Sequence, residues 1–131
     1  MVHNAVQEIV IDNLIKVSTN QIYAGVHWSK RNTLKQDYLW ITANPFKKLK
    51  PVNNKVDVDF TFYWTGKVLD SDNNGYVSKV LKDCLVHYKI LKNDTIEFVG
   101  RVSMESMKAD KNAKYKGDYC LIQIKERAVN L

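Results

Sequence analysis

Residues 56–64 (VDVDFTFYW) form the clearest alternating pattern of apolar and polar side chains in the sequence. In an extended chain, successive side chains point to opposite faces, so this pattern predicts a strand with one face in the core. Asp57 and Asp59 share the other face, as an ordinary half-exposed strand requires, and we assign them a structural role. The apolar face is formed by Val56, Val58, Phe60, Phe62 and Trp64.

Two helices are predicted, one before this strand in the sequence and one after it. The first begins at Ser29, has apolar residues at the i, i+4, i+7 spacing and ends near Pro45. The second follows Gly75, and its apolar residues recur at i, i+3, i+4, i+7 and i+8. These residues are Val77, Val80, Leu81, Cys84 and Leu85.

Three further strands are predicted over residues 7–11, 95–104 and 119–125. The last two are separated by a lysine-rich segment (KADKNAKYKG), which is typical of a mobile loop or an open hairpin. Strands interrupted by two helices indicate an α+β fold, a mixed sheet of about four strands with two main helices packed on it. We expect residues 1–131 to form a single domain.

The composition limits the classes of function. The formal net charge is +6, which favours a polyanionic partner such as nucleic acid. No apolar run approaches the ~20 residues of a membrane span and no secretory signal is visible, so we expect a cytoplasmic protein without a membrane partner. Phosphate-binding loops, dinucleotide fingerprints and nucleophile elbows are absent, and the isolated Cys84 and Cys120 are predicted to be buried free thiols.

An acidic pair, Asp70 and Asp72, stands between the strong strand and the second helix. In an extended chain both carboxylates would project to the same side, where their repulsion favours a cation between them. Carboxylate oxygens suit Mg²⁺ or Mn²⁺, which could polarise a phosphate and activate water. Lys79 follows about two helical turns later and could face the same phosphate. The alternative role for the two acids is helix capping and compensation of the helix dipole, without catalysis.

The spacing of these residues resembles that of the RusA family of Holliday-junction resolvases. The matching segments are Asp70-Ser-Asp72-Asn73, Lys79, Asp83-Cys-Leu85, Asn93-Asp94 before a strand, and Ser18-Thr-Asn20-Gln-Ile-Tyr23 after the first strand. Lys79 lies three residues further from Asp72 than in the best-known member. Asn93 replaces the first acid of a pair, so Asp94 would carry its metal-binding role.

The resemblance implies a homodimer that cuts branched DNA by paired symmetric nicks in recombination and repair, in a bacterial or phage context. Asp70, Asp72 and Asp94 are then the expected metal ligands and, with Lys79, the catalytic residues of a Mg²⁺- or Mn²⁺-dependent endonuclease. DNA contacts are expected from Asn20, Tyr23, Lys30 and Arg31, and Asp83 and Glu97 are secondary candidates. Asp83 could orient Lys79.

Two other functions remain open from the sequence. The segment DSDNNGYVS imitates an EF-hand calcium loop, although Leu81 stands where a bidentate Glu is required. The chain could also be a non-catalytic DNA-binding domain that uses lysines for phosphates and exposed aromatics such as Tyr23 for stacking. We expect Tyr63 and Trp64 to belong to the core.

Overall fold

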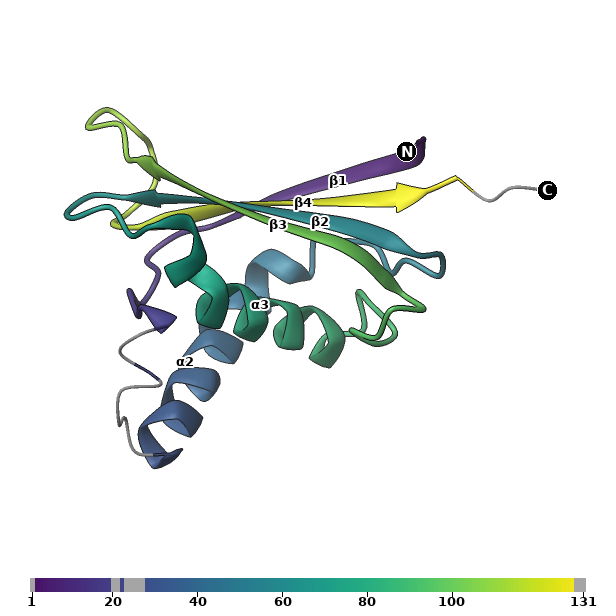
Figure 1. The fold of residues 1–131 in the computed structure, drawn as a ribbon, viewed down its shortest axis with the longest axis horizontal. Helices are drawn as coiled ribbons and strands as arrows, with labels where there is room; N and C mark the ends of the chain where they lie inside the picture. The colour runs from purple at the N-terminus through teal and green to yellow at the C-terminus, as the bar shows by residue number, and fades with distance from the viewer. Residues whose placement is uncertain (1, 20–21, 23–27, 129–131) are drawn as a thin grey trace.

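The computed structural model describes residues 2–19, 22 and 28–128 of the chain. Within them, four strands form one mixed sheet and two helices pack against one of its faces, as the sequence predicts (Figure 1). No helix within these residues is both long enough and apolar enough to cross a membrane. The elements are β1 (His3–Ile11), α2 (Trp28–Phe46), β2 (Val56–Trp64), η1 (Ser71–Asn74), α3 (Gly75–His87), β3 (Val99–Lys108) and β4 (Tyr119–Arg127).

The strand order is β1-β4-β2-β3, so the most apolar strand, β2, lies inside the sheet. β2 pairs with β4 in antiparallel and with β3 in parallel orientation, and β1 pairs with β4 in antiparallel orientation. The expectation of an open hairpin between the last two strands is therefore wrong. β2 lies between β3 and β4 in the sheet, so these two strands are not neighbours. The lysine-rich segment that connects them crosses the end of β2.

The helix-covered face of the sheet holds the core. Phe60, Phe62 and Trp64 lie side by side along β2, with ring centroids 6.1 and 5.6 Å apart. Trp64 is fully buried, as expected, but Tyr63 points to the opposite face and is only half-buried, because side chains alternate along a strand. The expected place of Tyr63 in the core is therefore wrong.

Both helices match their predicted apolar patterns. The five apolar residues predicted for α3 are all buried. Pro45 lies in the last turn of α2, near the end that it predicts. Cys84 and Cys120 are free, buried thiols, which confirms that prediction. Burial raises the pKa of Cys84 to about 11, so this thiol is a poor nucleophile at neutral pH.

The strand predicted over residues 95–104 is displaced. β3 begins only at Val99, because the amides of Phe98 and Val99 donate to the Thr95 carbonyl and close a turn. The Asp94 position therefore leads into a turn and not directly into a strand. β1 and β4 extend beyond their predicted ends, to His3 and Arg127.

Candidate functional site

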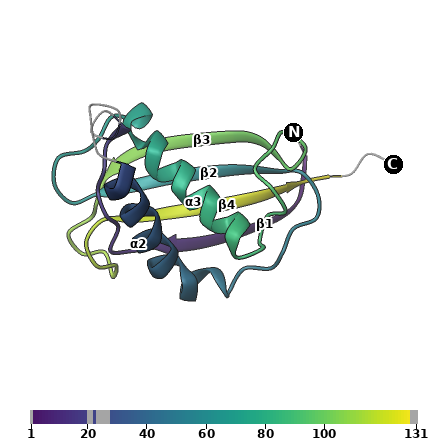
Figure 2. The ribbon, with the colours of Figure 1, turned by 90° about the horizontal axis from the view of Figure 1, so that it is seen from below.

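A basic groove lies between α2 and α3. Both helices begin at the same end of the sheet (Figure 2). Arg31 and Lys35 are four residues apart on α2, and Lys79 and Asp83 are four residues apart on α3, so each pair shares one helix face. The groove measures about 290 Å³. Its lining residues are Arg31, Asn32, Lys35, Tyr76, Lys79, Val80 and Asp83.

The electrostatics of this groove favour an anion. It contains three cationic side chains and one acid, Asp83, whose Oδ2 lies 3.9 Å from Lys35 Nζ. This pair is partly exposed, so it contributes little to stability and can rearrange around a ligand. The first turns of both helices lack acidic residues, although Asp70 and Asp72 lie just before α3 and compensate the positive end of its dipole.

Arg31 provides a second observation that favours an anion in the groove. Its Nε is buried and has no hydrogen-bond partner among the described residues. A buried guanidinium nitrogen without an acceptor is costly, and a phosphate oxygen in the groove would supply one. The backbone at this position is anchored to α3, since Tyr76 Oη donates to the Arg31 carbonyl at 3.4 Å.

Asp70 and Asp72 lie just before α3, in the segment that leads to Tyr76, a lining residue of the groove. Asp70 occupies the N-cap position of η1 but makes no capping hydrogen bond with its side chain, and both carboxylates are exposed. The side chain of Asp70 therefore does not cap the helix, which was its alternative role. Asp72 lies inside the 3₁₀ turn, so the expected extended geometry is wrong.

The junction of η1 and α3 is held by residues that the sequence analysis did not assign. Thr19 Oγ1 donates to the Asn73 carbonyl and accepts from the Tyr76 amide, both at 3.2 Å. On the other side, Asn74 Nδ2 donates to Ser106 Oγ of β3 at 2.6 Å. Thr19 belongs to the Ser18–Tyr23 motif of the RusA resemblance. That motif was the feature of the sequence that could have pointed to Thr19. These bonds fix the backbone that carries Asp70 and Asp72.

Asp94 lies at the opposite end of α3 from this acidic pair. Thirteen residues of helix span about 20 Å, and Asp94 follows the last of them. Among the residues that the structure describes, no three His, Cys, Asp or Glu side chains come together to hold a metal ion. The expected trio of Asp70, Asp72 and Asp94 therefore does not form within one chain, because a whole helix separates its members.

Asp94 instead borders a second hollow of about 300 Å³, between the middle of α2 and the C-terminal part of α3. Asp83 lines both hollows and pairs with Lys35, so the expected pairing with Lys79 is replaced by one across the helices. His87 is a further titratable residue of this hollow that the sequence gave no reason to single out. Glu97 is exposed in the turn before β3.

Of the four residues predicted to contact DNA, the structure describes Lys30 and Arg31. Arg31 lines the basic groove, and Lys30 is exposed beside it at the start of α2. Asn20 and Tyr23 lie outside the described residues.

The EF-hand interpretation is wrong for this segment. An EF-hand loop requires residue 81 to reach the ion, but Leu81 is fully buried in the core. Asn74 is also buried and donates to Ser106, away from the solvent that surrounds Asp70. The chain before Asp70 comes from a strand, where an EF-hand has a helix.

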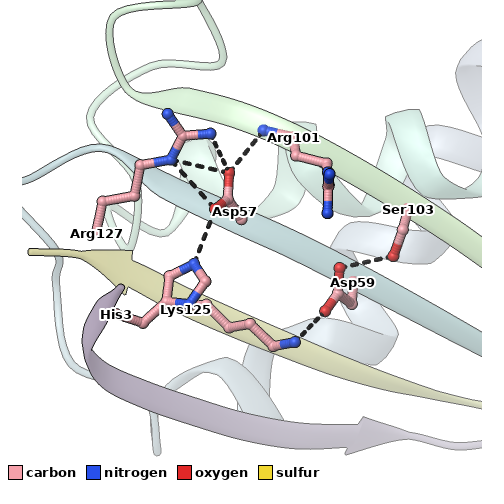
Figure 3. A network of polar contacts seen from close by, with 7 residues as sticks. All are labelled: His3, Asp57, Asp59, Arg101, Ser103, Lys125 and Arg127. Carbon is pink, nitrogen blue, oxygen red and sulfur yellow. Dashed lines mark hydrogen bonds and ion pairs between the residues drawn. The ribbon is translucent and has the colours of Figure 1, made fainter. Parts of the chain in front are cut away.

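The face of the sheet opposite the helices carries an ion-pair network around Asp57 (Figure 3). The Asp57 carboxylate accepts hydrogen bonds from the Arg127 guanidinium at 2.6 and 3.1 Å, from His3 at 2.8 Å and from the Arg101 amide at 2.8 Å. The bonds from Arg127 above all hold the pKa of Asp57 well below its usual range. The network joins β1, β2, β3 and β4, so it stabilises the sheet.

Asp59 lies two residues along the same face. Burial raises its pKa, but hydrogen bonds from Lys125 and Ser103 outweigh burial and lower the pKa overall. Lys125 Nζ lies 2.6 Å from Asp59 Oδ2. Both acids are engaged with neighbouring strands, and their side chains are occupied by these partners.

Asp57→Asn should destabilise the fold by about 2–4 kcal/mol at pH 7, because Arg127 would lose its carboxylate partner in a largely buried position. The pKa of Asp57 is lowered on folding, so its contribution is present above the unfolded pKa of about 3.9 and is lost as pH falls below that value. Urea unfolding at pH 7 and pH 3 should therefore show a smaller difference between variant and parent at pH 3.

Asp59→Asn provides the matched control for this prediction. Its side chain is 21% exposed, compared with 7% for Asp57, so its loss should cost about 1 kcal/mol or less. Gly100→Ala should imitate Asp57→Asn, because a Cβ there would lie 2.2 Å from Arg127 Nη2 and displace the guanidinium. Equal stability of parent and Asp57→Asn at pH 7 would contradict the role of the network.

Comparison with models of known protein families finds no match to this sequence, and no curated protein matches it. The resemblance to RusA-type resolvases therefore stands on the short motifs of the sequence itself. Of the residues in these motifs, the structure brings Lys79 and Asp83 into one groove and leaves Asp94 apart from the other two acids.

Proposed function

We propose that this chain is a metal-dependent endonuclease that acts on branched DNA, with a phosphate backbone bound in the groove between α2 and α3. The observation that carries the proposal is the position of Arg31, Lys35 and Lys79 in one groove along α3, the helix that Asp70 and Asp72 precede. Phosphates attract such a cluster of cations, and divalent ions attract exposed carboxylates.

Lys79 is the residue best placed to link the basic groove with the acidic pair Asp70 and Asp72. It lies in the second turn of α3, seven residues after Asp72, is exposed, and forms no ion pair with another described residue. A phosphate in contact with its ammonium would lie between the groove and the acidic pair. Arg31 and Lys35 would then hold the neighbouring phosphates of the same strand.

The metal site of one chain is incomplete among the described residues, since Asp70 and Asp72 offer carboxylates without a third acid. A Mg²⁺ or Mn²⁺ ion bound there would supply charge stabilisation to a phosphate. The homodimer implied by the resemblance would have to bring a further acid from the second copy, and Asp94, exposed at the far end of α3, is available for that role.

Non-catalytic DNA binding is the second candidate function, and it is favoured by the missing third acid in a single chain. A labelled four-way junction incubated with the protein and Mg²⁺ separates the two. We expect paired nicks that require Mg²⁺ and disappear with excess chelator. A junction that is bound at low salt but never nicked, with Mg²⁺ or Mn²⁺, would overturn the endonuclease and leave the binding function.

A further inference from the structure

A third hollow, which we name the tyrosine pocket, lies between the end of β2 and the loop that joins β3 to β4. It measures about 310 Å³, the lower end of the range for small-ligand sites. Small residues of the loop leave this space unfilled. Its lining residues are Thr65, Lys108, Ala109, Asp110, Lys111, Ala113, Tyr115, Gly117 and Tyr119.

Stacked aromatic rings form one wall of the tyrosine pocket. Tyr119 packs on Tyr63 with ring centroids 4.6 Å apart and planes 11° apart. On its other side, Tyr115 lies 4.8 Å away with its plane tilted by 40°, so these two rings diverge. Tyr115 is only half-buried, and both Tyr115 and Tyr119 line the pocket. A flat aromatic ligand could continue this stack.

The surroundings of the tyrosine pocket are basic. Residues 108–118 contain four lysines and two aspartates, and Lys108 and Lys111 line the pocket itself. Lys108 Nζ donates to the carbonyls of Thr65 and Gly66, both at 2.8 Å, which fixes its charge at the rim. Lys114 Nζ lies over the Tyr115 ring, 5.4 Å from its centroid, so this flexible side chain has to swing aside for a base to stack on that face. An anionic group attached to a stacked ring would meet these ammonium groups.

Hydrogen bonds hold the loop in place, although the sequence favoured a mobile segment. The amide and hydroxyl of Thr65 both donate to Asp118 Oδ1, at 2.8 and 2.9 Å. The Asn13 amide donates to the Lys116 carbonyl, and Gly117 adopts the positive φ of 62° that turns the chain toward β4. The pocket is therefore formed before a ligand arrives, which lowers the entropic cost of binding.

The tyrosine pocket lies at the same end of the sheet as the acidic pair. The loop between β3 and β4 and the segment between β2 and η1 extend from that end in both views (Figures 1 and 2). The bonds from Thr65 to Asp118 and from Lys108 to Gly66 tie these two segments together. A DNA strand that reached Asp70 could therefore also reach the pocket.

We propose that the tyrosine pocket binds an unpaired base of DNA, stacked on Tyr115, with its phosphates on the lysines of the loop. The inference rests on the proposed DNA binding, but not on cleavage. The aromatic wall fits a flat ring and the basic rim fits a negative charge. A nucleotide has both an aromatic base and a negatively charged phosphate. In a duplex both faces of a base are covered by its neighbours, so only an unpaired base can occupy the stack.

The test uses the full chain and three fluorescent DNA probes of the same length: a single strand, a perfect duplex, and a duplex with one unpaired 2-aminopurine. We expect the bulged duplex to bind more tightly than the perfect one, and the 2-aminopurine to be quenched by stacking. Tyr115→Ala should remove the quenching and weaken binding of the single strand and bulged duplex by about tenfold or more, with duplex binding unchanged. Tyr115→Phe, which keeps the ring, should behave as the parent.

Several outcomes would overturn the proposal. The first is that the bulged duplex binds without quenching of the 2-aminopurine. The second is that Tyr115→Ala lowers the affinity for all three probes equally. The third is that a free mononucleotide binds as tightly as the single strand. Asp72→Asn distinguishes the inference from the proposed function, because it should leave the quenching intact. Quenching by a parent protein that never nicks a junction would overturn the endonuclease alone, whereas nicking without quenching would overturn the pocket alone.

Discussion

Asp72→Asn is expected to lower the rate of junction nicking by about 10³-fold or more while leaving junction binding unchanged. The amide keeps the size of the side chain but removes the charge that would hold a divalent ion, and stabilisation by a bound metal contributes several kcal/mol to such a reaction. Asp72 is exposed and outside the core, so the fold should tolerate the change. Single-turnover nicking and anisotropy of a labelled four-way junction measure the two effects.

Asp94→Asn should be equally inactive if Asp94 contributes to the same site from a second copy. Mixing the two inactive variants then tests where the acids come from. A dimer of one Asp72→Asn chain and one Asp94→Asn chain would have one site with both acids intact, if each site is shared between chains. We expect such mixtures to recover single-strand nicks, whereas each variant alone remains inactive.

The same mixture gives no activity if all acids belong to one chain. That result would require α3 to rearrange, because Asp94 and Asp72 lie at its opposite ends. Asp37→Asn serves as the matched control, since Asp37 is an exposed acid of α2 that lines none of the hollows described above. Full nicking by Asp72→Asn would contradict the acidic site altogether.

Removal of both Arg31 and Lys79 should weaken DNA binding by about 10- to 100-fold at about 0.1 M salt. Each cation that neutralises a phosphate releases condensed counterions, so the slope of log affinity against log salt should fall in magnitude by about two. The loss should be similar for any sequence, because phosphate contacts carry no base information. Salt titrations by fluorescence anisotropy measure both quantities.

The control for this prediction removes two other cations. Lys50 and Lys92 are exposed and follow the ends of α2 and α3, away from the groove. Lys50→Ala with Lys92→Ala removes the same net charge, and we expect it to change the salt slope by much less. If both double variants lowered the affinity equally, net charge and not the groove would account for DNA binding.

How far the sequence predicts the site depends on the distance over which its residues interact. Arg31 with Lys35, and Lys79 with Asp83, are each four residues apart on one helix, so helical periodicity alone places each pair on a common face. That the two faces meet in one groove depends on how α2 and α3 pack on the sheet. No local pattern reports this packing.

The acidic residues show the opposite outcome. Asp70, Asp72 and Asp94 look alike as candidate ligands in the sequence, and the resemblance groups them. Whether the third reaches the other two depends on the length and direction of α3, and within one chain it does not. The stacking of Tyr115, Tyr119 and Tyr63 was missed for the same reason, because it joins a loop, the start of β4 and the end of β2.

By itself, the sequence determined the elements: the alternation of 56–64 required a half-buried strand, and the apolar spacing after Gly75 required a helix with one buried face. It also determined the positive charge that any partner must meet. Only the tertiary structure decided that β2 would separate β3 from β4, and which charges and rings would become neighbours. Local periodicity is set by backbone geometry over a few residues, whereas a site is assembled by contacts between segments that pack together for the sake of the core.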